Sequence, residues 1–195
     1  MPIRPLVLVL AGGMLVPLPG EPASPAHPVL VTARLYNTAR TAHIVKDAAL
    51  TAAQGALATG GVDLRWKDCD SADVCVMAPA AGELVIRLVR SPGQIVATRL
   101  VLGEAFIDMR VRTGVLATVF VDRVDSIAAL SETDAALLLG RTIAHELGHL
   151  LLGTNAHSVR GLMRAQWTPS DVRRHASADW ELTTEDATAI RRRLQ

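Results

Sequence analysis

The chemistry-bearing residues lie closest together in His145-Glu146-Leu147-Gly148-His149. Two histidines four positions apart lie on one face of a helix, one turn apart, so both imidazoles can bind a single zinc ion. Glu146 projects about 100° around such a helix from His145, close enough to act on a water bound to that zinc. Zinc lowers the pKa of this water, and the carboxylate can take its proton as it attacks a carbonyl group. The motif therefore predicts a hydrolytic zinc site.

A catalytic zinc also needs a third protein ligand and an open position for water. His157 follows the motif shortly after Gly153, a residue type that can end a helix and turn the chain back over the metal. We therefore expect His157 to be the third ligand. Glu181 or Glu185, near the start of the last predicted helix, is the alternative.

The stretch HELGHLLLGTNAHSVRGLM resembles the metzincin metallopeptidases, and most closely their matrixin-like bacterial domains. The family pattern is HExxHxxGxxH, followed by a tight turn that carries a methionine under the zinc. The resemblance implies zinc on His145, His149 and His157, with Glu146 as the general base and Met163 as the methionine of the turn. It also implies a zinc-dependent endopeptidase whose substrate is a peptide or protein.

This resemblance extends over about residues 29–195, although only the stretch quoted above carries specific motifs. It implies a metzincin-like fold, with a twisted mixed sheet, an antiparallel edge strand, a long active-site helix, the methionine turn and a C-terminal helix. In such enzymes the edge strand binds extended substrate through main-chain hydrogen bonds. Residues 100–108 are the best match for this strand.

The chain departs from the family pattern in the loop before the third histidine. His149 and His157 are eight positions apart, whereas the family spacing is six, so the loop carries two extra residues. No tyrosine follows the methionine turn, where Arg164 and Trp167 are found instead. These departures leave two alternatives open: an exported, non-catalytic binding domain with the same fold, or a zinc hydrolase with a non-peptide substrate.

The hydrophobic pattern independently predicts a mixed α+β fold, in which a strand and a helix precede several further strands and two more helices. The predicted strands cover residues 29–36, 62–67, 83–90, 99–108 and 115–122, and the first helix covers residues 41–58. Ser131 is the expected N-cap of the long helix, with Asp134 as its capping-box partner, and Gly153 is the expected stop. Thr183 or Thr184 is expected to cap the last helix. A bulge or close approach is expected at Gly103.

The composition is that of a folded domain, and its charge balance does not indicate a nucleic-acid partner. Of 195 residues, 50% are hydrophobic, and 20 Lys and Arg nearly balance 19 Asp and Glu, for a net charge of +1. This excludes global disorder and offers no basic surface for nucleic acid. Residues 27–195 are expected to form one domain.

The first 26 residues have the pattern of a secretory signal peptide: a basic start, an apolar middle and a small-residue exit. The sequence therefore predicts a secreted or periplasmic protein without stable membrane insertion after cleavage. Cys69 and Cys75, the two cysteines, are expected to form a disulfide in that compartment. Free thiols, or half of a metal site, are the alternatives; no second cysteine pair would complete such a site.

Overall fold

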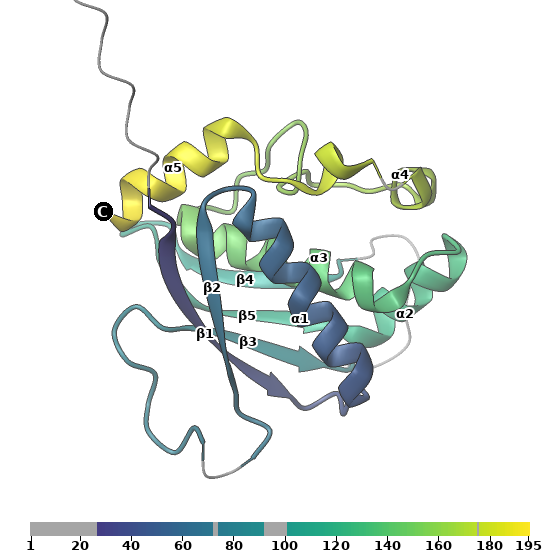
Figure 1. Ribbon diagram of the computed structural model, residues 1–195, viewed down its shortest axis with the longest axis horizontal. Helices are drawn as coiled ribbons and strands as arrows, with labels where there is room; N and C mark the ends of the chain where they lie inside the picture. Colours follow the sequence, from purple (N-terminus) through teal and green to yellow (C-terminus); the bar gives the residue numbers. More distant parts are fainter. Residues whose placement is uncertain (1–26, 72–73, 92–100, 175) are drawn as a thin grey trace, which may run out of the picture.

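Five strands form one mixed sheet in the computed structural model, which describes residues 27–71, 74–91, 101–174 and 176–195 (Figure 1). The strands are β1 (Val29–Asn37), β2 (Val62–Asp68), β3 (Leu84–Val89), β4 (Gly103–Asp108) and β5 (Thr113–Phe120). Their order is β2-β1-β3-β5-β4, and all neighbours are parallel except β4 and β5. The mixed α+β fold is confirmed, and its antiparallel strand, β4, lies at an edge.

Two long helices, α1 and α3, pack against each other and against the sheet (Figure 1). The helices are α1 (His43–Ala58), α2 (Val121–Leu130), α3 (Ala135–Leu152), α4 (Pro169–Arg174) and α5 (Thr184–Leu194), with a short 3-10 turn, η1 (Ser177–Trp180). The helix α3 contacts β3, β4 and β5 as well as α1, α2 and α5. This central position explains why its sequence is apolar on most sides.

Close packing fixes the position of α3. Leu138, Ile143 and Leu147 are fully buried in the hydrophobic core that α3 shares with the sheet. A Cβ added at Gly140 would overlap the carbonyl oxygen of Ala49 in α1, so the two helix backbones approach closely at this glycine. Side chains borne on α3 are therefore held by the core of the protein.

The expected N-cap of the long helix is wrong. Asp134 caps α3, and its side chain accepts a hydrogen bond of 2.8 Å from the backbone N–H of Leu137. Ser131 instead ends α2, and Glu132, with φ of 53°, turns the chain between the two helices. The sequence pattern does not predict α2, because its first residues continue the apolar run of β5 and fit the strand expected at residues 115–122.

The fourth strand is shorter than predicted. It begins at Gly103 rather than at residue 99 or 100, which lie outside the described residues. The expected close approach at Gly103 is confirmed, since a Cβ there would lie 2.6 Å from Cγ of Glu146. The pairing irregularity of this strand lies further along, between Phe106 and Asp108.

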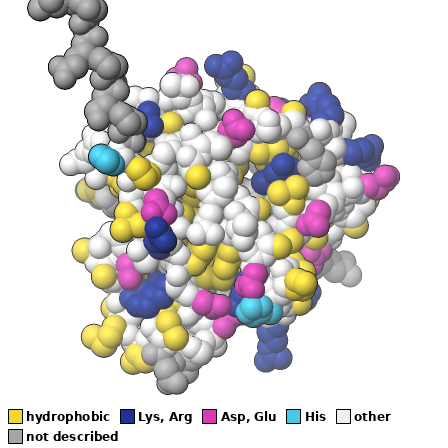
Figure 2. Space-filling model, in the orientation of Figure 1, with side chains coloured by type: hydrophobic (Ala, Val, Ile, Leu, Met, Phe, Trp, Pro, Cys, Tyr) yellow, Lys and Arg dark blue, Asp and Glu magenta, His cyan; other side chains and the backbone are white. Residues whose placement is uncertain are grey.

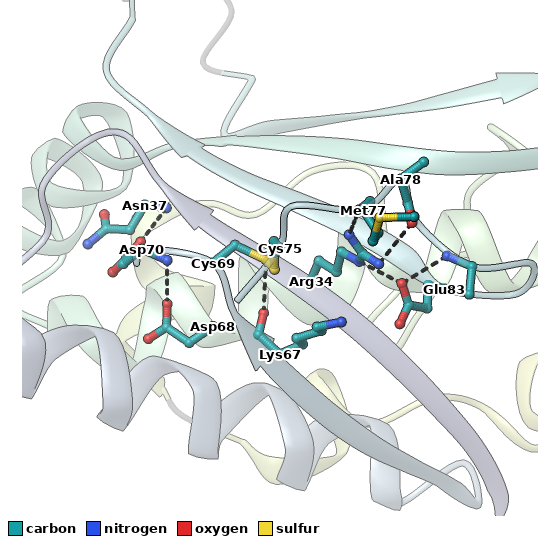
Figure 3. The surroundings of a disulfide bond; sticks show 11 residues. Arg34, Asn37, Lys67, Asp68, Cys69, Asp70, Cys75, Met77, Ala78 and Glu83 are labelled. Carbon is teal, nitrogen blue, oxygen red and sulfur yellow. Dashed lines mark hydrogen bonds and ion pairs between the residues drawn. A yellow bond between two sulfur atoms is a disulfide. The ribbon is translucent and has the colours of Figure 1, made fainter. Parts of the chain in front are cut away.

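The predicted disulfide between Cys69 and Cys75 is present at the end of β2 (Figure 3). Beside it, the buried ammonium of Lys46 lies 2.6 Å from carboxylate oxygens of both Asp68 and Asp70. Arg34, buried on β1, donates to the carboxylate of Glu83 and to two carbonyl groups of the loop beyond the disulfide (Figure 3). The loop is thus held to α1 near its start, through Lys46, and to β1 near its end, through Arg34.

Reduction of this disulfide is expected to lower the free energy of unfolding by about 2 kcal/mol, because the bond closes only a short loop. Urea denaturation with and without reductant measures the effect. A Cys69→Ser/Cys75→Ser double variant serves as the control, since reductant has no target in it. Equal midpoints for the reduced and oxidised wild type would contradict the expectation.

The surface seen in Figure 2 carries basic and acidic side chains interspersed, as the near-neutral net charge implies. None of the helices that the structure describes is long and apolar enough to span a membrane. The predicted signal peptide, residues 1–26, lies outside the described part of the chain.

Candidate metal centre

Three histidines converge beside α3. His145 and His149 lie one turn apart on the helix, and His157 comes from the loop that follows it. One possible ligand atom from each side chain lies within 4.8 Å of the others. The structure therefore brings together the three histidines singled out in the sequence, and neither Glu181 nor Glu185 belongs to the group.

The path of the chain to His157 depends on a glycine. Gly153 adopts a left-handed conformation, with φ of 60° and ψ of 42°, and ends α3 as expected. The N–H of Thr154 then bonds to the carbonyl oxygen of His149 at 3.3 Å, which closes the helix end. Because of this turn, the longer loop returns to the helix face and brings His157 next to the other two histidines.

Hydrogen bonds to the backbone set the tautomers of the two helix histidines. Nδ1 of His145 lies 2.7 Å from the carbonyl oxygen of Leu162, and Nδ1 of His149 lies 2.8 Å from that of Thr154. A carbonyl oxygen only accepts, so each Nδ1 carries the proton. Each neutral ring then has its free lone pair on Nε2, which is the ligand atom a metal needs.

The two Nε2 atoms of His145 and His149 lie 3.1 Å apart. With both protons on Nδ1, neither nitrogen can donate to the other, and a cation between the two lone pairs would offset their repulsion. Two nitrogens bound to one tetrahedral zinc lie about 3.3 Å apart, which this spacing fits.

Burial keeps these imidazoles neutral. It lowers the pKa of His145 to about 4 and also lowers the pKa of His149 and His157. A proton is therefore poorly suited to the space between these nitrogens, and a metal ion is well suited to it, because metals bind the neutral imidazole. The three histidines can hold a metal ion.

Glu146 lies next to this cluster and is 5% exposed. The absence of a side chain at Gly103 makes room for it, because a Cβ there would lie 2.7 Å from Oε1 of Glu146. Burial, together with the nearby Glu104 carboxylate, raises the pKa of Glu146 to about 8. A cation on the histidines would favour its ionised form. Such a carboxyl group is suited to exchanging protons near neutral pH.

Met163 is fully buried and packs against α3 at Gly148, next to His149. A Cβ added at Gly148 would lie only 2.4 Å from the sulfur of Met163. The N–H of Ser158 bonds to the carbonyl oxygen of Met163 at 2.9 Å, so the segment after His157 folds back on itself. This turn also contains Leu162, whose carbonyl orients His145.

Gly148→Ala is expected to lower the free energy of unfolding by about 1–3 kcal/mol, because the added methyl group overlaps the Met163 sulfur. Gly55→Ala is the matched control. Gly55 is also inside a helix, but an added Cβ has nothing within 4 Å, so this change should stabilise by up to about 1 kcal/mol. Equal effects in chemical denaturation would show that the Met163 contact is not tight.

The loop that carries His157 is anchored to α5. The hydroxyl of Ser158 donates to Asp186, with its oxygen 3.0 and 3.2 Å from the two carboxylate oxygens. Asp186 also forms the capping box with Thr183, which confirms Thr183 as the cap of the last helix. The third histidine thus depends on contacts with the C-terminal helix.

A cavity of about 730 Å³ opens beside the histidines. It is bordered by β4, α3 and the segment that leads to η1. Sequence reasoning did not identify Arg141, Trp167 or Trp180 as part of this site. For Arg141 a signal was present, since it lies four residues before His145 on the same helix face.

No family model matches the chain, and no curated protein is significantly similar to it.

Proposed function

We propose that this chain is a zinc-dependent metallopeptidase with a metzincin-like fold, which hydrolyses peptide bonds. The observation that carries the proposal is the convergence of three neutral histidines and one buried carboxyl group at a single cavity. Structural zinc sites use four protein ligands, whereas hydrolytic sites use three and leave one position open. Three histidines fit the hydrolytic kind.

The roles follow from the chemistry of each side chain. His145, His149 and His157 would hold the zinc, which when bound supplies Lewis acidity toward a carbonyl group and toward water. Glu146 takes the proton of the attacking water and returns it to the leaving amine. Met163 would be the buried methionine of the turn that supports the ligands from below. The family resemblance assigns this role to it.

The substrate is expected to bind along β4. The strand order leaves β4 with β5 on one side and no described strand on the other. An extended peptide can pair with this free edge through main-chain hydrogen bonds. Because Gly103 lies against Glu146, a peptide on this edge passes close to the general base.

The disulfide supports the proposed location. Such bonds persist in oxidising compartments, so Cys69–Cys75 fits a secreted or periplasmic protein. Residues 1–26 are the proposed export signal. The proposed partners are a peptide or protein substrate, with neither nucleic acid nor stable membrane insertion.

The test is to measure zinc in the purified protein and then to screen a peptide library. One tightly held zinc per chain, with cleavage that a chelator stops, supports the proposal. Zinc without cleavage of any peptide would favour a non-peptide substrate or a binding domain. No zinc uptake, even after refolding with metal, would contradict the metal centre itself.

A further inference from the structure

An acidic side chain follows directly after the glycine that faces the general base. Glu104 is the second residue of β4, at the edge of the sheet (Figure 1), and its side chain is exposed. It lines the same cavity as the three histidines, and its carboxylate lies near that of Glu146. A negative charge therefore borders the place where the substrate is expected to pass.

Glu104 belongs to the face of the sheet opposite to α3. A Cβ at Gly103 would point at Glu146 of α3, and successive residues of a strand point to opposite faces. The antiparallel register pairs Glu104 with Thr118 of β5, and the Thr118 hydroxyl accepts a hydrogen bond of 3.1 Å from Arg87 of β3. Glu104, Thr118 and Arg87 therefore share the outer face of the sheet.

The structure pairs no cation with the Glu104 carboxylate. It takes part in none of the ion pairs in the part of the chain that the structure describes. On its own face of the sheet, Arg87 donates to Thr118. Both arginines of the cavity, Arg141 and Arg164, stack on tryptophan rings. A carboxylate in this situation, beside a substrate-binding edge, favours a cationic ligand.

The pairing of the substrate with β4 determines which substrate residue meets Glu104. In an antiparallel pair, the more stable arrangement, directly opposite residues place their side chains on the same face, with Cβ atoms about 4.5–5.5 Å apart. The substrate residue opposite Gly103 lies at the general base, because Gly103 lies against Glu146. The residue opposite Glu104 is the next one toward the N-terminus of the substrate. It is therefore the first or second residue before the scissile bond.

We propose that Glu104 is a specificity-determining residue, which binds a cationic group of the substrate on the N-terminal side of the scissile bond. The inference rests on the proposed peptidase function and gives that function a substrate class. The cation comes from a Lys or Arg side chain at the first or second position before the cut, or from a free N-terminal amine there. Opposite charges directly across an antiparallel pair stabilise it, so strand pairing and charge recognition act together.

The experiment uses a cleaved library peptide, remade with lysine or acetyl-lysine at each of the two positions before the cut. Acetylation removes the charge of the lysine side chain. We expect kcat/KM to favour lysine by about three- to fivefold at one of these positions, the upper range for a partly exposed ion pair. Glu104→Gln should bring this ratio close to one, and Glu104→Asp should keep part of it. The ratio does not depend on the fraction of folded enzyme, so a partly unfolded variant still gives a valid result.

The matched control is Glu132→Gln, which removes an exposed carboxylate from the turn between α2 and α3, outside the cavity. The same loss of charge there should leave the lysine preference unchanged. Raising the salt concentration to about 1 M shortens the screening length to about 3 Å, so it should lower the wild-type ratio but not that of Glu104→Gln. A wild-type ratio near one before the cut, or a preference that survives Glu104→Gln, overturns the proposal.

Peptides that begin at the favoured position separate the two sources of the cation. They carry an uncharged side chain there and either a free or an acetylated N-terminus. A preference for the free amine that depends on Glu104 assigns the site to the N-terminus of the substrate. Equal cleavage of the two forms, together with the lysine preference of the longer peptides, assigns it to a basic side chain.

A binding readout separates this inference from the peptidase proposal. The Glu146→Gln variant, incubated with zinc, is titrated in a calorimeter with acetyl-Ala-Val-Lys-Val-Ala-amide and with its acetyl-lysine counterpart. The flanking valines favour the extended conformation that pairs with a strand. Tighter binding of the lysine peptide, lost when Glu104→Gln is added, supports the cationic site even if the wild type cleaves no peptide. Equal affinity for the two peptides overturns it, even if peptides are cleaved.

Discussion

Replacing Glu146 by glutamine is expected to lower kcat/KM for peptide hydrolysis at least about a hundredfold, while the protein keeps its zinc. Glutamine has nearly the same size and fills the same space beside Gly103, but it cannot accept the proton of the attacking water. The side chain is not among the three grouped ligands, so metal affinity should be unchanged. Steady-state kinetics and metal analysis of the same preparation measure both quantities.

Glu185→Gln is the control for this change, because it removes a carboxylate that is exposed on α5. It should leave both turnover and zinc content unaltered. If Glu146→Gln retained wild-type turnover, the general base would have to be another group. If the variant instead lost its zinc, Glu146 would be acting as a ligand.

The second large effect is expected from His157→Ala, which should weaken zinc binding by more than about a hundredfold. Removing a hydrogen-bond partner of a metal ligand already costs about 10- to 100-fold in affinity, and removing the ligand itself costs more. The two remaining histidines lie on one helix and stay in place, because α3 is held by the core. Competition with a chelator of known affinity measures the change.

His43→Ala is the matched control, since His43 is an exposed histidine at the start of α1, remote in sequence from the site. Its substitution should not alter zinc affinity. Unchanged affinity in His157→Ala would remove this residue from the ligand set. Glu181→Gln and Glu185→Gln would then identify the carboxylate that replaces it.

The placement of His145 and His149 on α3 could be predicted from the sequence because their geometry is local. The spacing of His145 and His149 sets their relative position on any helix, and the turn at Gly153 needs only a glycine. The alternating and helical hydrophobic patterns likewise located the strands and the helices α1, α3 and α5. These features depend on neighbouring residues and on little else.

The features that were missed depend on contacts between distant segments. The stack of Arg141, Trp180, Trp167 and Arg164 joins α3 to a segment whose path follows from tertiary packing. The spacing of Arg141 and His145 indicates a shared helix face, but no spacing indicates the contact with the tryptophans. The helix α2 was missed because the buried Val121 and Val124 fit both a strand that continues and a helix that begins. Only the packing of α2 against α3 decides between the strand and the helix.

The anchoring of Ser158 by Asp186 has a consequence for the order in which the site assembles during synthesis. The strands and α3 leave the ribosome before α5 does, and domains begin to fold as their segments emerge. His145 and His149 can thus be in place while His157 still lacks the helix that holds its loop. A nascent chain that ends before residue 186 has two of the three histidines in place, while the loop of the third lacks its anchor. The three-histidine cluster is thus complete only after α5 has been made.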